Sequence, residues 1–115
     1  MKTNIIINLS VEGLHRWKDA KNKLIQVRFL SDLHRHNFYI TCKKLVNHDD
    51  RDIEFIDYKH NIVEYLTEKY FDKYYKCLLF DNMSCEMIAK ELLAQFDLEY
   101  CSCMEDNENG AEVYV

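Results

Sequence analysis

The sharpest local feature of the sequence is the stretch His34-Arg35-His36-Asn37-Phe38-Tyr39-Ile40-Thr41. Its last four residues are strong β formers, and they predict a strand that runs from about His34 to Val46. Residues two apart in a strand point to the same face of a sheet, so His34 and His36 project together. One face of this strand therefore begins with two imidazole rings.

Three further segments have the pattern of strands. Apolar and polar residues alternate over residues 4–12, which predicts a strand, whereas residues 13–33 are polar and irregular. Near the C-terminus, residues 98–105 and 113–115 favour two more strands. Asn109-Gly110, between these two, is a hairpin-turn signal.

In the middle of the chain the apolar residues change to a helical spacing. Residues 52–70 are predicted to form one helix with Asp52 as its N-cap, and a second helix starts near Ser84, which can cap it. The order strand, strand, helix, helix, strand, strand predicts a single α+β domain over residues 1–115. We expect a four-stranded antiparallel sheet with both helices on one face, and open sheet edges that favour a homo-oligomer.

The composition excludes several classes of protein. The 115 residues include no proline and only two glycines, Gly13 and Gly110, which leaves no phosphate-binding glycine loop. A net charge of −5 argues against a nucleic-acid binder, and no apolar run is long enough to span a membrane. The five cysteines are an odd number without a CxxC pair, and we find no export signal. We therefore expect reduced thiols in a cytoplasmic protein.

A third histidine, His15, follows the first predicted strand, and antiparallel pairing would bring it beside His34 and His36. Three neutral imidazoles with an open fourth position are typical of a catalytic zinc site. The alternative is that the three histidines share no ion, because short histidine motifs are common. His48 and His60 have no such partners and are interpreted as surface residues.

Five stretches match a series of motifs in the order of one known family. Residues 33–38 match LHGHNY, and residues 11–15 stand where that family has FxAAH. Residues 52–59 resemble GMVxDFxxLK, residues 83–89 resemble PTxENLA, and residues 104–106 are similar to a closing ET motif. The chain therefore resembles the 6-pyruvoyltetrahydropterin synthase / 6-carboxytetrahydropterin synthase family, whose subunits adopt the tunnelling fold (T-fold).

This resemblance implies what the site contains. It implies that the three histidines hold Zn²⁺ and that Glu105 anchors the amino-pyrimidine edge of a pterin or purine-derived ligand. Ser84 and Cys85, which open the second helix, are implied to contact the same ring. In the family the site lies between subunits, with the metal histidines and the anchoring glutamate coming from different chains, so the resemblance also implies a homo-oligomer, either a trimer or a hexamer.

The departures from the family concern its catalytic residues. Leu30 stands where the family has a catalytic cysteine, and Arg35 replaces the glycine of LHGHNY. Asp72 matches the aspartate of the family's Asp-His pair, whereas Lys73 replaces the histidine. If the chain is an enzyme, Asp72 and Lys73 are its candidate catalytic residues.

Three hypotheses follow from the sequence. The first is a zinc-dependent enzyme with 6-pyruvoyltetrahydropterin synthase-like lyase activity. The second is a non-catalytic oligomeric protein that sequesters or senses a nucleotide-derived small molecule, as would suit a phage or mobile-element accessory protein. The third is a structural oligomer without metal.

Overall fold

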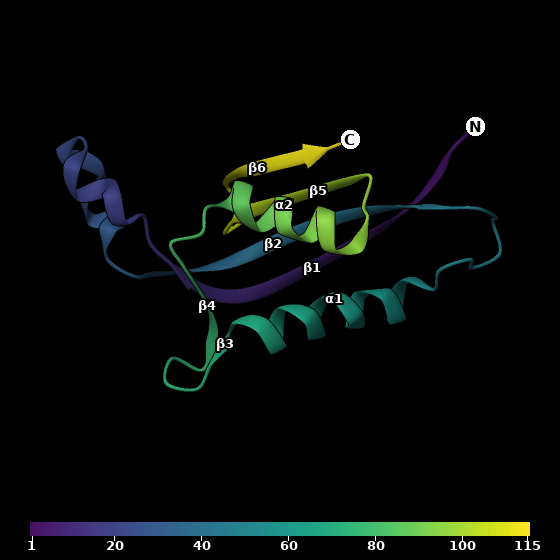
Figure 1. Cartoon of the computed structure of the whole chain (residues 1–115), viewed down its shortest axis with the longest axis horizontal. Helices are drawn as coiled ribbons and strands as arrows, with labels where there is room; N and C mark the ends of the chain where they lie inside the picture. The colour runs from purple at the N-terminus through teal and green to yellow at the C-terminus, as the bar shows by residue number, and fades with distance from the viewer.

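A computed structural model describes residues 1–115 as a mixed α+β structure (Figure 1). One six-stranded sheet is accompanied by two α-helices and two short 3-10 helices. In chain order the elements are β1 (Thr3–His15), η1 (Lys18–Asn22), η2 (Ile25–Ser31), β2 (His34–Val46), α1 (Phe55–Tyr70), β3 (Phe71–Asp72), β4 (Cys77–Asp81), α2 (Cys85–Phe96), β5 (Tyr100–Glu105) and β6 (Asn109–Tyr114).

The two long strands β1 and β2 form the centre of the sheet. They pair antiparallel along their full length, from Thr3 opposite Val46 to His15 opposite His34. The predicted strand from His34 to Val46 is confirmed. In both strands the buried side chains fall at alternate positions, because one face of the pair is covered by the helices and the other is largely exposed.

The sheet has six strands in the order β3-β4-β1-β2-β5-β6, so the expectation of four strands is wrong. The additional strands, β3 and β4, lie between the two helices in sequence, where an aromatic-rich stretch hides the strand pattern. Leu78 and Phe80 of β4 are buried, and this burial holds the strand against the core. β4 runs parallel to β1 and pairs with Gly13–His15, so the expectation of a wholly antiparallel sheet is also wrong.

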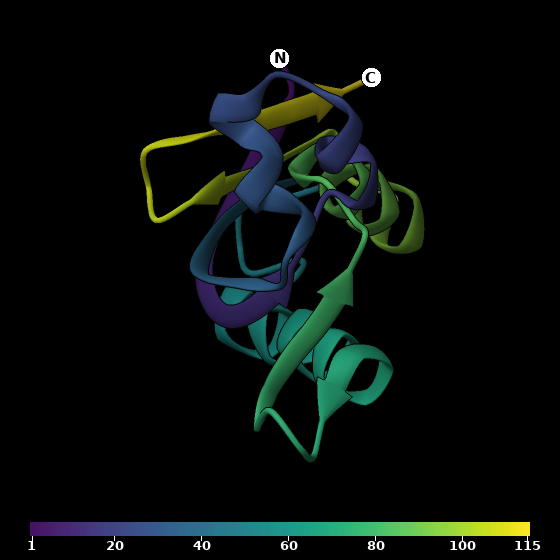
Figure 2. The same ribbon diagram turned by 90° about the vertical axis from the view of Figure 1, so that its left-hand side faces the viewer.

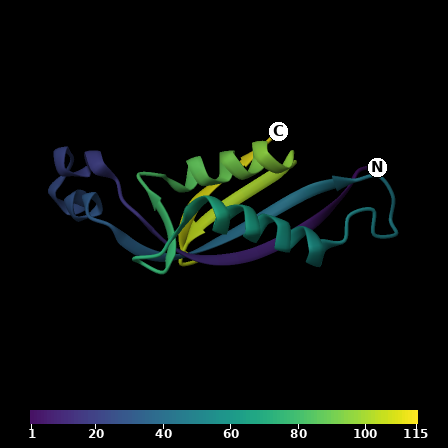
Figure 3. The same cartoon turned by 60° about the horizontal axis from the view of Figure 1, so that its bottom comes forward.

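Both α-helices lie on the same side of the sheet and bury their apolar faces against it (Figure 3). This arrangement agrees with the expectation from the element order. The helices share one hydrophobic core with four strands of the sheet, β1, β2, β4 and β5. Its fully buried members include Ile62 and Leu66 of α1, Ile88, Ala89 and Leu92 of α2, and Phe38, Ile40, Cys42, Cys101 and Cys103 of the sheet.

The helix caps confirm one prediction and correct another. Ser84 caps α2 as predicted, because its side chain accepts a backbone N–H at 3.2 Å. Asp52 does not cap α1. The N-cap is Glu54, whose Oε2 accepts the N–H of Asp57 at 2.6 Å, while Asp52 accepts the N–H of Asn47 at 2.7 Å in the preceding turn. The glutamate side chain of Glu54, which is longer than an aspartate side chain, makes the capping hydrogen bond. The N-cap thus lies two residues after Asp52, the residue predicted from the sequence.

The hairpin between β5 and β6 turns at residues 106–108, so the turn predicted at Asn109-Gly110 is wrong. Asp106 and Asn107 have φ angles of 51° and 58°. Aspartate and asparagine tolerate this left-handed region better than most residues, so they form the turn. Asn109-Gly110 is already paired with β5, and β6 is therefore longer than predicted.

The segment between β1 and β2 extends beyond the end of the sheet, at the left of Figure 1. It forms η1 and η2 rather than the irregular loop expected from residues 13–33. The Trp17 N–H donates to the Leu30 carbonyl at 2.7 Å, which holds the two ends of the segment together. Ala20 is the one residue of η1 and η2 that is buried. We call residues 16–33 the β1–β2 segment.

All five cysteines are free and buried, in agreement with the expectation of unpaired thiols. Cys42 and Cys101 face each other across β2 and β5, with their Sγ atoms 3.9 Å apart. A hydrogen bond to Cys42 and burial raise the pKa of the Cys101 thiol, so it stays protonated.

None of the helices combines the length and apolarity needed to cross a membrane.

Candidate metal centre and cavity

The three histidines meet where β1 ends and β2 begins. His15 is the last residue of β1 and lies opposite His34, while His36 lies opposite Gly13 on the same face of the sheet. One ring nitrogen from each histidine lies within 4.8 Å of the others, close enough to hold a metal ion together. The prediction that antiparallel pairing brings His15 beside the other two is therefore confirmed.

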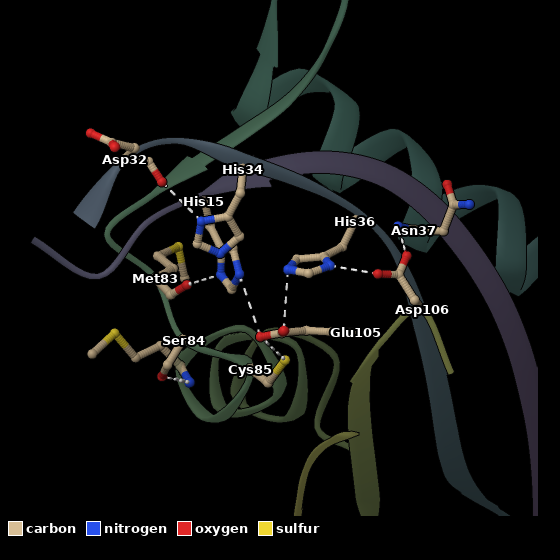
Figure 4. A network of polar contacts seen from close by, with 11 residues as sticks. His15, Asp32, His34, His36, Asn37, Met83, Ser84, Cys85, Glu105 and Asp106 are labelled. Carbon is tan, nitrogen blue, oxygen red and sulfur yellow. Dashed lines mark hydrogen bonds and ion pairs between the residues drawn. The ribbon is translucent and has the colours of Figure 1, made fainter. Parts of the chain in front are cut away.

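Each imidazole uses its Nδ1 atom for a hydrogen bond to a different acceptor (Figure 4). His15 Nδ1 is 2.8 Å from the Met83 carbonyl oxygen, and His34 Nδ1 is 2.9 Å from the Asp32 carbonyl oxygen. His36 Nδ1 is 2.6 Å from Oδ2 of Asp106. Oxygens of these kinds only accept, so each Nδ1 donates a proton. In a neutral imidazole with this tautomer, the Nε2 atom keeps a free lone pair. This second set of contacts is the usual way in which proteins orient metal-binding histidines.

Two of the Nε2 atoms fit a bound cation because they have no other partner. The Nε2 atoms of His15 and His36 are buried without a hydrogen bond. They lie 3.4 Å and 3.2 Å from the two carboxylate oxygens of Glu105. A lone pair of a neutral imidazole facing a carboxylate oxygen at this distance is repulsive unless a positive charge lies nearby. A divalent ion bound by the three histidines would supply that charge.

Burial of His15 favours the neutral imidazole that a metal requires. Burial lowers the pKa of His15, and this outweighs the opposite effects of the Met83 carbonyl and the Glu105 carboxylate. Hydrogen bonds from His36 and from the Asn37 N–H hold the pKa of Asp106 below its ordinary value. His15 therefore stays unprotonated, and Asp106 stays ionised.

A cavity of about 690 Å³ opens beside the three histidines. His15, His34 and Glu105 line it from the sheet. The β1–β2 segment and the start of α2 line other parts of the cavity. These two parts of the chain lie close together, because the chain passes from β4 to α2 beside the β1–β2 segment (Figure 2). The remaining residues that line the cavity are Arg16, Trp17, Lys18, Asp19, Leu30, Asn82, Met83, Ser84, Cys85, Glu86, Met87, Asn109 and Gly110.

The structure brings the predicted ligand-binding residues together. Ser84, Cys85 and Glu105 all line the cavity. The Cys85 thiol donates to Oε1 of Glu105 at 3.8 Å, so the carboxylate lies between this thiol and the two imidazoles of His15 and His36 (Figure 4). Glu105 thus presents its carboxylate both to His15 and His36 of its own chain and to the open cavity, whereas the family resemblance implied a glutamate from another chain.

The structure does not bring the predicted catalytic pair to this cavity. Asp72 lies in β3, where its Oδ1 accepts the N–H groups of Tyr74 and Tyr75 at 2.9 Å and 3.0 Å. Lys73 is exposed in the turn that follows β3. Neither residue lines the cavity, whereas Leu30 does. In this chain Asp72 therefore stabilises a tight turn.

Sequence reasoning missed Asp106 and Asp81. Asp106 directly follows Glu105 in a turn of acidic residues, and nothing in that pattern distinguishes a histidine partner from a solvated acid. Asp81 pairs with Arg16 at 2.7 Å and with Lys18 at 3.5 Å across 65 and 63 residues of chain. Only the parallel pairing of β4 with β1 reveals these contacts.

Comparison with known proteins adds no family assignment. No protein-family model matches the chain, and no curated protein matches it in sequence. The function is therefore inferred from the geometry of the metal centre and the cavity.

Proposed function

We propose that this chain is a divergent zinc-binding T-fold protein, similar to 6-pyruvoyltetrahydropterin synthases, that binds a pterin or purine-derived small molecule. The observation that carries the proposal is the convergence of one ring nitrogen from each of three histidines at the wall of the cavity, with Glu105 beside two of them. A single sheet with two helices on one face supports the T-fold part of the proposal.

Zinc is the metal that suits three neutral imidazoles with an open fourth position. His15, His34 and His36 would hold it, and their Nδ1 hydrogen bonds keep the rings in the required tautomer. Bound at this place, zinc would polarise a ligand oxygen or a water molecule.

Glu105 is proposed to anchor the heterocycle. A carboxylate offers two acceptor oxygens, which suits the paired N–H donors of an amino-pyrimidine edge. The Glu105 side chain is about one-third exposed, at 34%, and that exposure faces the cavity. Ser84 and Cys85, at the first turn of α2, lie beside it and would contact the same ring.

We further propose that synthase activity is altered or lost. The cavity wall carries Leu30 where the family has a thiol, and an aliphatic side chain cannot accept a proton. The carboxylate of Asp72 is occupied by two backbone N–H groups away from the cavity. These two observations favour the second hypothesis, a non-catalytic protein that sequesters or senses its ligand, over a working lyase.

Alanine variants separate the metal from the ligand. In His34→Ala we expect the zinc content to fall from one ion per chain to near zero, measured by elemental analysis. In Glu105→Ala we expect zinc to be retained and binding of pterin or guanine, measured by calorimetry, to be lost. His48→Ala, at an exposed histidine of the loop before α1, is the matched control and should change neither. Full zinc content in His34→Ala would refute the metal assignment.

Turnover is tested with the zinc-loaded protein and dihydroneopterin triphosphate. We expect mass spectrometry to detect no product from the triphosphate. In a parallel gel filtration with unsubstituted pterin, we expect the pterin to be retained with its mass unchanged. Steady release of a product would refute the loss of activity and support a lyase that works without the family's thiol.

A further inference from the structure

The part of the cavity wall supplied by the β1–β2 segment and residues 82–87 carries four large apolar side chains. Trp17 and Leu30 face the cavity from the β1–β2 segment, and Met83 and Met87 face it from the start of α2. Trp17 is 42% exposed and Met87 is 52% exposed, so both offer apolar surface to a ligand. Burying such surface is favourable in proportion to its area.

The two cations that line this cavity are already paired. Arg16 Nε is 2.7 Å from Oδ1 of Asp81, and Lys18 Nζ is 3.5 Å from Oδ2 of the same carboxylate. Although burial alone would raise it, the pKa of Asp81 is lowered by these two cations, so Asp81 is ionised and neutralises part of their charge. A phosphate group entering the cavity would have to compete with Asp81 for them.

Apart from the histidines, the remaining charged side chains that line the cavity are acidic. Glu86 lines the cavity from the first turn of α2 and makes no ion pair. Asp19 also lines it, although Lys23 lies 3.2 Å from its carboxylate. At the N-terminus of α2, the Met87 N–H is taken by Ser84 Oγ, which removes one donor that a phosphate would use. The side chains that line the cavity therefore include acidic groups, Asp19 and Glu86, but no basic side chain without an acidic partner.

From these contacts we infer that the cavity selects a heterocycle with an uncharged, apolar substituent and discriminates against a phosphorylated one. This inference rests on the proposed function, because it assumes that the heterocycle is anchored at Glu105. The substituent would pack on Trp17, Leu30 and Met87, while the cations stay paired with Asp81. The ligand would thus differ in charge from the triphosphate used by the family that the chain resembles.

The chain carries its own reporter for this test, because Trp17 is its single tryptophan and lines the cavity. Zinc-loaded protein is titrated with 6,7-dimethylpterin, with unsubstituted pterin and with dihydroneopterin triphosphate, and the quenching of Trp17 fluorescence gives each Kd. We expect dimethylpterin to bind about tenfold more tightly than the triphosphate. Equal or tighter binding of the triphosphate would overturn the inference.

The contacts of Asp81 with Arg16 and Lys18 predict that the variant Asp81→Asn binds the triphosphate more tightly. Residue 81 has a φ of 54°, a conformation that asparagine tolerates, so the substitution removes the charge with little strain. Releasing Arg16 and Lys18 should tighten triphosphate binding about tenfold and leave the Kd of dimethylpterin unchanged. Asp49→Asn, at an exposed residue of the loop before α1, changes the net charge equally and should have no effect. Identical triphosphate affinities in Asp81→Asn, Asp49→Asn and the unmodified chain would count against the inference.

Leu30→Asn tests the apolar wall without touching the charges. We expect it to weaken dimethylpterin binding about tenfold while the Kd of unsubstituted pterin changes little. Equal losses for both compounds would show that Leu30 supports the cavity as a whole and would contradict the specificity.

The outcomes also separate this inference from the proposed function. If none of the three pterins quenches Trp17 fluorescence, and calorimetry detects no binding either, the proposed function fails and the inference fails with it. If all three bind, and binding is lost in Glu105→Ala, the proposed function stands and the order of the Kd values alone decides the inference.

Discussion

Asp106 is the charged member among the three acceptors that orient the metal-binding histidines. His15 and His34 donate to backbone carbonyls, whereas His36 donates to the Asp106 carboxylate at 2.6 Å. The same carboxylate accepts the Asn37 N–H at 2.9 Å, so it is held from both sides. A carboxylate partner makes an imidazole a stronger electron donor to a metal.

Asp106→Asn should therefore weaken zinc binding without removing a ligand. We expect the Kd for zinc to rise about 10- to 100-fold, measured by competition with a chromophoric chelator. Glu108→Gln, in the same exposed turn, is the control and should leave the Kd unchanged. An unchanged Kd in Asp106→Asn would mean that His36 is either oriented by other contacts or not a ligand.

At the scale of residues, the sequence was sufficient to predict that the three histidines lie together. It was insufficient to predict the groups that accept the hydrogen bonds from their Nδ1 atoms. Period-two spacing places His34 and His36 on one face, and strand pairing brings His15 beside them. Two of the three Nδ1 partners are backbone carbonyls, which every residue carries, so no side-chain pattern marks them. Asp72 matched a motif, yet its carboxylate serves a local turn. A motif match of one residue does not determine where that side chain lies.

Among the elements, α1 and α2 are joined by a polar cluster around Glu91. Its carboxylate accepts from Tyr70 Oη at 2.6 Å and from Tyr65 Oη at 3.0 Å, and Lys69 Nζ lies 3.1 Å away. Burial alone would raise the pKa of Glu91, but these donors outweigh it and hold the pKa below its ordinary value. The ionised carboxylate thus connects α2 to three side chains of α1.

Glu91→Gln should destabilise the fold and change its response to acid. Because the pKa is lower in the folded state, the contribution of Glu91 is complete above about pH 4.3, the pKa in the unfolded chain, and disappears as the pH falls through the folded value. We expect a loss of about 1–2 kcal/mol at pH 7 in urea unfolding, and a shallower decline of stability below about pH 4.3. Glu64→Gln, on the exposed face of α1, should show neither change.

The elements that the sequence predicted well are those with a long, regular pattern. β2 and α2 have the expected character and the predicted starting residues or cap. β3 and β4 were missed because two and five residues are too few to show a period. Their existence depends on pairing with β1, which is a tertiary contact rather than a local preference.

On the scale of the whole molecule, the sheet has two unprotected edges. β6 pairs only with β5, and β4 covers β1 only over Gly13–His15, so the first part of β1 is also open on that side. Open edges with unpaired N–H and C=O groups tend to pair with another chain. A homo-oligomer built through these edges remains a prediction.

Sedimentation equilibrium tests this prediction directly. We expect a mass three or six times the 13.9 kDa of one chain at micromolar concentration. Glu112→Pro, in the middle of β6, should lower the mass, because proline interrupts an edge that another strand would use. A mass of one chain in the unmodified protein would refute edge pairing and would leave the cavity to function within a single subunit.

The β1–β2 segment has a kinetic consequence. With Ala20 as the one buried residue of η1 and η2, few apolar contacts oppose its local unfolding. Its amides should exchange with solvent far faster than those of β1 and β2, and trypsin should cut first at Lys21 or Lys23, both exposed. Trp17 and Leu30 belong to this segment, whereas the histidines lie on the sheet, so opening of the segment would widen the cavity without displacing the histidines.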